Sequence, residues 1–180
     1  MGDPGSRLWV ALVHHPVLNR VGETSTTAIT SMDVHDFARS CAFYDVAPVY
    51  IVHPADGMHA FVEEMRGYWR EGDGQQRNPG RGASLAAIRM VRSLDEAVAA
   101  MEGASVWFTS AKPPAEATTG VEALARMSGR HLIVFGTGWG LDAAAMARPT
   151  GWLSPIEGIG MVRHLSVRAA LAIYLDRLRR

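Results

Sequence analysis

A glycine-rich segment, GTGWGL from Gly136 to Leu141, follows a short apolar run and has the composition of a ligand-binding loop. Glycine lets backbone amides approach a ligand without obstruction by side chains, so such a turn after a strand suits a polar cofactor. The spacing is Gly-x-Gly-x-Gly rather than the Gly-x-Gly-x-x-Gly of dinucleotide-binding loops, although Glu157 stands about twenty residues on, where a ribose-binding acid is expected. A cofactor loop, a dinucleotide-binding site and a tight turn without a ligand are therefore the three interpretations.

A second glycine-containing segment, residues 153–168 with the sequence LSPIEGIGMVRHLSVR, leads into the last apolar stretch of the chain. Ser166 stands where a helix N-cap is expected, and capping alone explains a serine there. A glycine-rich loop at the start of a helix also offers its free backbone amides to a polar cofactor. Capping and cofactor binding are both open interpretations of this segment.

Arginines gather between residues 66 and 92, where Tyr68 and Trp69 lie among them. Guanidinium groups pair with phosphate oxygens and aromatic rings stack on bases, so this region is a candidate RNA surface. Acidic residues such as Glu63 and Glu71 lie in the same region, so a solvated helix face is the alternative. The arginines concerned are Arg66, Arg70, Arg77, Arg81, Arg89 and Arg92.

Spacing argues against several kinds of catalytic site. The seven histidines are dispersed, and neither His14–His15 nor His53 with His59 has the i,i+4 spacing of helical metal ligands, so no metal site is predicted. Ser84 lies in GASLA, which is not the Gly-x-Ser-x-Gly of hydrolases, and the sequence has no Walker loop. Hydrolase, ATPase and zinc-enzyme functions therefore lose their usual support.

The composition is that of a soluble globular protein, and we expect one domain over residues 1–180 with a flexible leader at residues 1–6. The chain is 48% hydrophobic and 20% charged, and 18 basic residues balance 18 acidic ones, so any RNA contact must come from a local patch. Apart from Lys112 the basic residues are arginines, through either a GC-rich genome or phosphate recognition. With Cys41 alone, no signal peptide and no membrane span, a cytoplasmic protein is expected.

Hydrophobic periodicity predicts alternating strands and helices. Continuous apolar strands predict an α/β fold, with a mostly parallel sheet covered by helices on both faces. Ser31 or Asp33 is expected to cap the first helix, and Ser93 a later one. Strands are expected at 8–13, 49–52, 105–109 and 132–135, helices at 32–44, 57–70, 94–102, 120–127 and 165–178, and a polar loop at 72–82.

Ligands of such sheets bind beyond the carboxyl ends of the strands, which here are segments 14–22, 53–57, 109–114 and 136–140. The last expected helix, 165–178, is apolar around most of its circumference, so it is expected to be buried on more than one side. Its second side is covered either by its own domain or by another subunit.

The chain resembles the SPOUT (SpoU–TrmD) superfamily of S-adenosylmethionine-dependent RNA methyltransferases. Within it, the chain is similar over nearly its whole length to a small bacterial family of single-domain RNA methyltransferases. The blocks that carry the resemblance are LVHHPVLNRVGE (12–23), TAITSMDVHDFARS (27–40), YWREGDGQQRNPGR (68–81), WFTSAK (107–112), FGTGWGL (135–141) and HLSVRAALAIYLDRL (164–178).

The resemblance implies roles for individual residues. The first superfamily motif pairs an asparagine with an arginine six residues later, and here Asp33 and Arg39 have that spacing. Arg39 is the first candidate for the catalytic group, with Asp33 or His35 as alternative proton acceptors, and Trp69, Asn78 and Arg81 are expected to lie toward the RNA. The residues implied in binding S-adenosylmethionine are Thr109, Phe135, Gly136, Thr137, Gly138, Gly140, Leu153, Pro155, Ile156, Gly158, His164, Leu165 and Ser166.

This sequence departs from the superfamily pattern at Gly138, which replaces a glutamate, and at Ser166, which replaces an asparagine. The resemblance also implies a C-terminal trefoil knot, with 136–140 and 153–163 as its loops, and a homodimer. It implies methylation of tRNA or rRNA, at a ribose 2′-oxygen slightly before a base nitrogen. The alternatives are a module that binds RNA or another partner with a degenerate cofactor site, and a nucleotide-binding oxidoreductase.

Overall fold

The computed structural model describes residues 7–114, 118–146 and 149–180, so the expected leader at residues 1–6 lies outside the described part. Within these ranges seven strands form one sheet in the order β5-β4-β1-β8-β6-β9-β7, and their pairs are parallel. Its strands are β1 (Arg7–Val13), β4 (Val49–Val52), β5 (Ile88–Val91), β6 (Ser105–Phe108), β7 (Thr118–Thr119), β8 (Arg130–Gly136) and β9 (Gly151–Leu153). A separate antiparallel hairpin consists of β2 (Val17–Leu18) and β3 (Thr24–Ser25).

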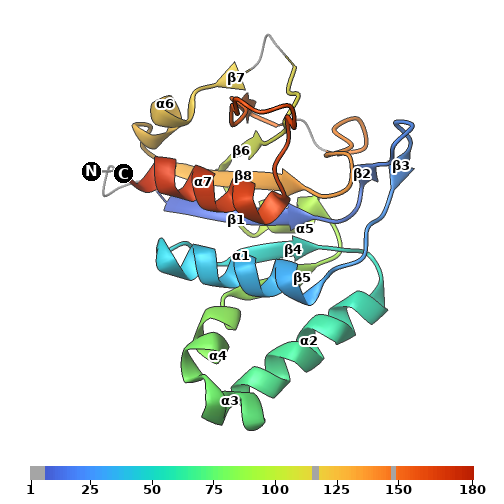
Figure 1. Ribbon diagram of the computed structural model, residues 1–180, viewed down its shortest axis with the longest axis vertical. Coiled ribbons are helices and arrows are strands. Elements are labelled where there is room, and N and C mark those ends of the chain that lie inside the picture. Colours follow the sequence, from blue (N-terminus) through green and yellow to red (C-terminus); the bar gives the residue numbers. More distant parts are fainter. Residues whose placement is uncertain (1–6, 115–117, 147–148) are drawn as a thin grey trace.

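Helices cover both faces of this sheet, as the apolar strands predict. In Figure 1, α1 and α7 lie in front of the sheet and α5 lies behind it. The α/β fold with a parallel sheet is therefore confirmed. The helices are α1 (Ser31–Phe43), α2 (Asp56–Arg70), α3 (Asp73–Arg77), α4 (Pro79–Leu85), α5 (Leu94–Ala99), α6 (Val121–Ala125) and α7 (Val167–Arg179).

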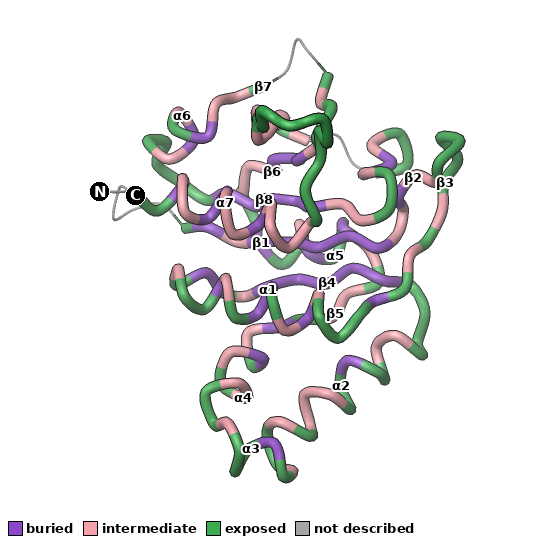
Figure 2. The backbone as a smooth tube through the Cα atoms, viewed as in Figure 1, coloured by how far each residue is buried: buried purple, intermediate pink, exposed green. Residues whose placement is uncertain are grey.

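The central strand β1 supplies side chains to two cores. Val10 and Leu12 belong to the core under α1 and α7, whereas Ala11 and Val13 belong to the core under α5. Because successive side chains of a strand point to opposite faces, a strand buried on both faces must be apolar at every position. Figure 2 shows this burial at the centre of the molecule, with the segment that leads into α7 exposed.

The first helix begins one residue earlier than the sequence predicts. Its N-cap is Thr30, not Ser31 or Asp33. The Thr30 hydroxyl accepts from the backbone N–H of Asp33 at 3.2 Å, and the Asp33 carboxylate accepts from the backbone N–H of Thr30 at 3.3 Å. This reciprocal arrangement is a capping box, in which the acidic residue stands at the third helical position.

The expected polar loop at 72–82 is wrong, because it contains α3 and most of α4. The side chain of Asn78 accepts from the backbone N–H of Arg81 at 3.2 Å, and Pro79 occupies the first helical position, where its missing N–H costs nothing. The glycines of this region permit close packing, because a Cβ on Gly82 would stand 2.5 Å from the carbonyl oxygen of Trp69. The high glycine content of this region therefore does not indicate a loop.

The strand β5 (Ile88–Val91), which pairs with β4 in register from Val49 and Ile88 onward, was not predicted. Arg89 interrupts its sequence IRMV, and the strand lies at the edge of the sheet, so it lacks the continuous apolar run of the central strands. Helix α7 buries Leu171, Tyr174 and Leu175 inside its own chain. Its other residues from Val167 to Arg177 are half-buried.

Candidate functional site

The carboxyl ends of β1, β8 and β6 lie side by side, because Val13 pairs with Gly136 and Phe108 pairs with Val134. Thr109 follows β6 and is 8% exposed, with its hydroxyl and its backbone N–H both donating to the Val134 carbonyl at 3.0 Å. Two of the predicted cofactor segments, 109–114 and 136–140, therefore begin at one edge of the sheet. Phe135, also predicted to bind cofactor, is a core residue.

The ring of Phe135 packs edge-on against Phe37 of α1 at 5.9 Å and against Tyr174 of α7 at 5.8 Å between centroids. It is 1% exposed. Its side chain therefore supports the loop from below, and only its backbone is near the edge of the sheet.

The glycine-rich loop is bound to the β2–β3 hairpin. The Trp139 N–H donates to the Leu18 carbonyl at 3.0 Å, and the Leu18 N–H donates to the Gly140 carbonyl at 2.9 Å. Gly138 and Gly140 have φ values of 58° and 112°, which glycine adopts at low cost. A Cβ on Gly138 would stand 3.0 Å from the Leu18 carbonyl oxygen, so close packing within the chain itself already accounts for this glycine.

A relay of hydrogen bonds joins this loop to a buried histidine. The Thr137 hydroxyl donates to the Val13 carbonyl at 3.1 Å, so it accepts from the Thr27 hydroxyl at 2.5 Å. The Thr27 hydroxyl has then used its proton, and it accepts from Nδ1 of His14 at 3.0 Å. Neutral His14 therefore carries its proton on Nδ1 and a lone pair on Nε2.

His14 is 1% exposed, and its Nε2 is buried without a hydrogen-bond partner among the described residues. Burial lowers the pKa of His14 to about 4, against a smaller opposing effect of the Asp33 carboxylate, so the ring is neutral near pH 7. The His53 ring lies 6.3 Å away, and burial lowers its pKa too. The sequence placed His14 in segment 14–22, directly after the central apolar strand, but gave no role to this side chain.

The third predicted cofactor segment follows β9. Leu153 is buried, the Ser154 N–H donates to the Thr119 carbonyl at 2.9 Å, and the Tyr174 hydroxyl donates to the Ser154 carbonyl at 2.8 Å. Pro155 and Ile156 are half-buried. An open hollow of about 430 Å³ is lined by Gly120, Val121, Glu122, Ser154, Pro155, Glu157 and Arg177.

From Gly158 to Ser166 the segment is exposed, including the predicted cofactor residues His164 and Leu165. Ser166 is the N-cap of α7, and its hydroxyl accepts from the Ala169 N–H at 3.3 Å, so the capping interpretation is confirmed. In the described part of the chain, no hydrogen bond uses the N–H groups of Ile156, Glu157 or Gly158. Backbone donors without a partner in the chain suit a polar cofactor, and here they lie on a loop that is half-buried at Ile156 and exposed at Glu157 and Gly158.

The candidate catalytic residues lie on α1 and face different neighbours. Asp33 is engaged at both oxygens, by the capping box and by Arg168 of α7 at 3.8 Å. Arg39 is exposed, about 9 Å further along the helix axis. The chain thus brings Asp33 to the start of α7, near the third cofactor segment, and leaves Arg39 apart from both glycine loops.

His35 instead joins the residues predicted to contact RNA. Its ring meets the Trp69 ring edge-on at 5.9 Å, and the Arg81 guanidinium lies over the Trp69 ring at 4.4 Å from the centroid. Burial, followed by the Arg81 charge, lowers the pKa of His35. Asn78 is the N-cap of α4, the helix that carries Arg81.

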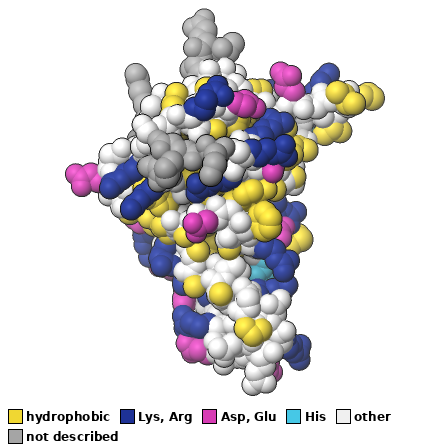
Figure 3. All heavy atoms as spheres, turned by 90° about the vertical axis from the view of Figure 1, so that its left-hand side faces the viewer, with side chains coloured by type: hydrophobic (Ala, Val, Ile, Leu, Met, Phe, Trp, Pro, Cys, Tyr) yellow, Lys and Arg dark blue, Asp and Glu magenta, His cyan; other side chains and the backbone are white. Residues whose placement is uncertain are grey.

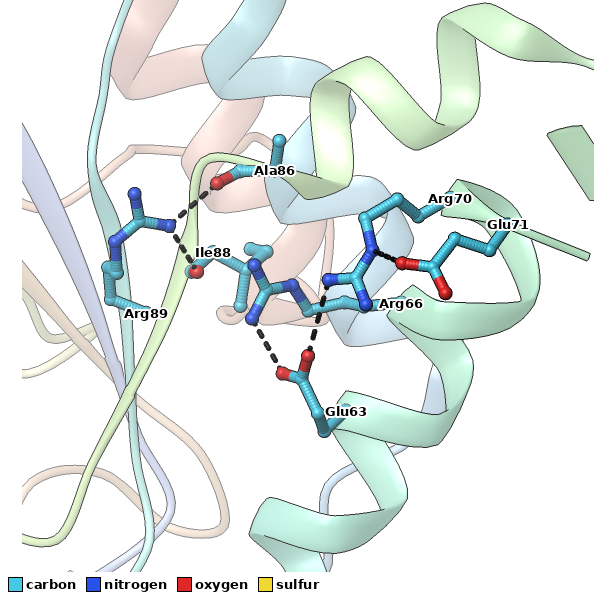
Figure 4. A network of polar contacts seen from close by, with 7 residues as sticks. All are labelled: Glu63, Arg66, Arg70, Glu71, Ala86, Ile88 and Arg89. Carbon is cyan, nitrogen blue, oxygen red and sulfur yellow. Dashed lines mark hydrogen bonds and ion pairs between the residues drawn. The ribbon is translucent and has the colours of Figure 1, made fainter.

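Several of the gathered arginines are paired within the chain (Figure 4). Arg66 and Arg70 reach Glu63 at 2.7 and 3.6 Å, and Arg70 also reaches Glu71 at 2.6 Å. Arg89 donates to the carbonyls of Ala86 and Ile88, and Arg92 pairs with Asp56. The contacts of Arg66 and Arg70 on α2 are those of a solvated helix face, whereas Arg89 and Arg92 lie in and after the edge strand β5.

The described ranges contain no group of three or more histidine, cysteine, aspartate or glutamate side chains placed to hold a metal ion. No helix within them is long and apolar enough to span a membrane.

Comparison with known proteins places this geometry in a family. Residues 7–180 match a family described as SAM-dependent RNA methyltransferase. A tRNA (guanine-N(1)-)-methyltransferase of Oleidesulfovibrio alaskensis is 34% identical over 97% of this chain, which spans 42% of that relative's length. An uncharacterized protein of Aquifex aeolicus is 33% identical, over 95% of this chain and 87% of its own.

The fold is also shared with solved structures. A probable methylase family protein of Haemophilus influenzae superposes with a TM-score of 0.64, over 96% of this chain and 64% of its own, at 18% sequence identity. The match over residues 7–180 and the shared fold lead to one conclusion: this chain belongs to the family of SAM-dependent RNA methyltransferases.

Proposed function

We propose that this chain is a single methyltransferase domain that transfers a methyl group from S-adenosylmethionine to tRNA or rRNA. The observation that carries the proposal is the family match over residues 7–180, nearly the whole chain. The name of the Oleidesulfovibrio alaskensis relative supports tRNA as the substrate. Because the chain spans 42% of that relative, its activity is tested on the chain itself.

The residues at the carboxyl edge fit the cofactor. The N–H groups of Ile156, Glu157 and Gly158 would hold its polar groups, whereas Thr137 and Thr109 would fix the neighbouring loops, since their backbone N–H groups donate to Val13 and Val134. When bound, S-adenosylmethionine supplies an activated methyl group on a sulfonium. The protein orients the RNA acceptor and takes up its proton.

Among the candidates for the proton acceptor, His35 is favoured over Asp33, whereas the guanidinium of Arg39 stays protonated and would contact the acceptor or its phosphate. Both oxygens of Asp33 are engaged in capping and in the ion pair with Arg168. The lowered pKa of His35 keeps its ring neutral near pH 7, as a proton acceptor requires. The resemblance of Asp33 and Arg39 to the first superfamily motif implies a ribose 2′-oxygen as the acceptor, whereas the relative's name favours guanine N1.

A second region that could attract RNA lies at the amino edge of the sheet, at the opposite end of the strands from the cofactor segments. Arg7 and Arg130 are register partners at the start of β1 and β8, and both are exposed, as is Arg179 at the end of α7. Figure 3 shows basic side chains gathered on this face, which carries both ends of the described chain. Local charge of this kind attracts phosphate although the formal net charge is zero.

A homodimer and a trefoil knot are part of the same proposal, as is a cytoplasmic location. The dimer is supported by the fully exposed side chains of Ile159 and Met161, beside Val162 at 71% exposure. Apolar side chains exposed together mark an interaction surface. The knot is supported by β9, which lies between β6 and β7 although both precede it in the chain.

Calorimetric titration with S-adenosylmethionine, followed by transfer of radiolabelled methyl groups to bulk tRNA and rRNA, tests the proposal. We expect micromolar cofactor binding and labelled RNA. Digestion of the RNA to nucleosides then separates a 2′-O-methyl product from 1-methylguanosine. Binding of NADH without S-adenosylmethionine would support an oxidoreductase instead, and RNA binding without methyl transfer would support a degenerate site.

A further inference from the structure

The tip of the glycine-rich loop presents a tryptophan to solvent. Trp139 is 67% exposed, and the glycines on both sides of it adopt positive φ values. The Trp139 N–H donates to Leu18, and the Gly140 N–H donates to the Thr137 carbonyl at 3.0 Å. The Trp139 ring is therefore exposed on a backbone that these hydrogen bonds hold in one conformation.

Trp139 differs in this respect from the other four tryptophans of the chain. Trp107 is buried and donates to His131 at 3.2 Å, and Trp152 packs edge-on against Phe108. Trp9 is half-buried. Trp139 thus combines an exposed ring with a backbone fixed by hydrogen bonds, which leaves its ring accessible to a planar ligand.

Trp69, which the sequence predicts as a stacking platform, already makes contacts within the chain on its ring. The Arg81 guanidinium occupies a face of its ring, and the rings of His35 and Tyr68 meet it edge-on. A Cβ on Gly74 would stand 2.7 Å from the Trp69 ring, so α3 also packs against it. Among the tryptophans, this arrangement leaves Trp139, not Trp69, with an open ring.

The neighbouring hairpin adds a cation and a second apolar side chain. Between β2 and β3, the Asn19 side chain accepts from the N–H groups of Val21 and Glu23 at 2.9 and 3.0 Å and donates to the Glu23 carboxylate at 3.0 Å. This turn is thus fixed, with Arg20 exposed and Val21 68% exposed. A base stacks on an aromatic ring and its phosphate pairs with an arginine, so this surface matches a single-stranded nucleotide.

We propose that Trp139 is a stacking platform for an unpaired base of the RNA substrate, with Arg20 facing the adjoining phosphate. This inference rests on the proposed function, since it takes RNA as the partner. Trp139 lies on the glycine-rich loop, which is also a predicted cofactor segment. The stacked base therefore lies beside the nucleotide that receives the methyl group.

The test compares Trp139→Ala and Trp139→Phe with the wild-type chain. Affinity for tRNA and for a short single-stranded RNA is measured by fluorescence anisotropy of labelled RNA. Trp139→Ala is expected to weaken binding about tenfold, and Trp139→Phe only slightly, because phenylalanine keeps a stacking face. Phe43→Ala is the matched control, because Phe43 is 80% exposed at the far end of α1.

Intrinsic fluorescence gives a second, independent measurement. RNA is expected to quench the tryptophan emission of the wild-type chain, and Trp139→Phe is expected to lose most of that quenching. Unchanged RNA affinity in Trp139→Ala would overturn the proposal. So would dissociation of a dimer in that variant without loss of RNA affinity, because Trp139 would then contact a second copy.

The stacking role of Trp139 and the methyltransferase activity can be tested separately. If the wild-type chain binds RNA through Trp139 but neither binds S-adenosylmethionine nor transfers methyl groups, the platform stands and the enzymatic function does not. If methyl transfer is normal in Trp139→Ala at limiting RNA, the function stands and the platform does not.

Discussion

At the scale of single residues, His14, Thr27 and Thr137 show how a hydrogen-bond network fixes the chemical state of a side chain. The relay ends on the Val13 carbonyl, which only accepts, so the position of every proton in it follows. It also fastens the glycine-rich loop to the first strand. The pKa of His14, lowered to about 4 by burial, makes this arrangement sensitive to acid.

We predict that the protein loses stability as the pH falls from about 6.5 to about 4. In this range the unfolded state protonates His14 and the folded state does not, which costs about 3 kcal/mol in the free energy of unfolding. Stability should be independent of this group above pH 6.5. The lowered pKa values of His35 and His53 act in the same direction.

Urea denaturation across this pH range is the measurement, with His14→Asn as the comparison. Asparagine keeps a donor near the place of Nδ1 but does not titrate, so its stability should depend less steeply on pH. His14→Ala should also lose the contact with Thr27 and be less stable than His14→Asn at neutral pH. Equal slopes for the wild type and His14→Asn would contradict the assignment.

At the scale of elements, contacts within the chain itself account for the residues of the corner formed by α2, α3 and α4. Asn78 caps α4, and Gly74 and Gly82 let the short helices approach Tyr68 and Trp69 closely. The sequence predicts these residues as an RNA surface because arginines and aromatic rings occur together there. Cation–π contacts within a protein use the same residue types, so the pattern alone does not separate the two.

Asn78→Ala is expected to cost about 1 kcal/mol of stability through loss of the cap. Asn78→Ser should retain most of that stability, because serine caps helices about as well as asparagine. Thermal unfolding measures both. If Asn78→Ser keeps wild-type stability yet loses affinity for tRNA, Asn78 contacts RNA in addition to capping α4.

The sequence predicts the elements that local pattern determines. The continuous apolar runs at 8–13 and 49–52 match β1 and β4, and Ser166 caps α7 as its type and position indicate. The relay through Thr27 and Thr137 was out of reach, because these residues are 110 positions apart and neither has a distinctive neighbourhood in sequence. Likewise β5, a short edge strand, has no continuous apolar run.

At the scale of the whole molecule, the exposed segment before α7 is the feature that a single chain leaves unexplained. Ile159 and Met161 are fully exposed, and Leu165 is 46% exposed at the start of a helix whose polar residues are few. Burial of such side chains against a second copy would stabilise a dimer, since apolar area removed from water contributes about 25 cal/mol per Å².

Ile159→Asp combined with Met161→Asp is expected to convert the proposed dimer to a monomer, because it would place charges in the proposed interface. Both side chains are exposed in the single chain, so the fold should persist, which circular dichroism checks. Analytical ultracentrifugation measures the mass. Met127→Asp, at a residue 39% exposed beyond α6, is the control. A wild-type chain that sediments as a monomer would contradict the prediction.

The position of β9 between β6 and β7 has a consequence for biosynthesis. Residues 105–108 and 118–119 leave the ribosome before residues 151–153, yet the later strand lies between them. The backbone groups that β6 and β7 present to β9 must wait unpaired until about 30 further residues have been translated. The early chain therefore exposes open strand edges, and a chaperone that shields them would raise the yield of native protein.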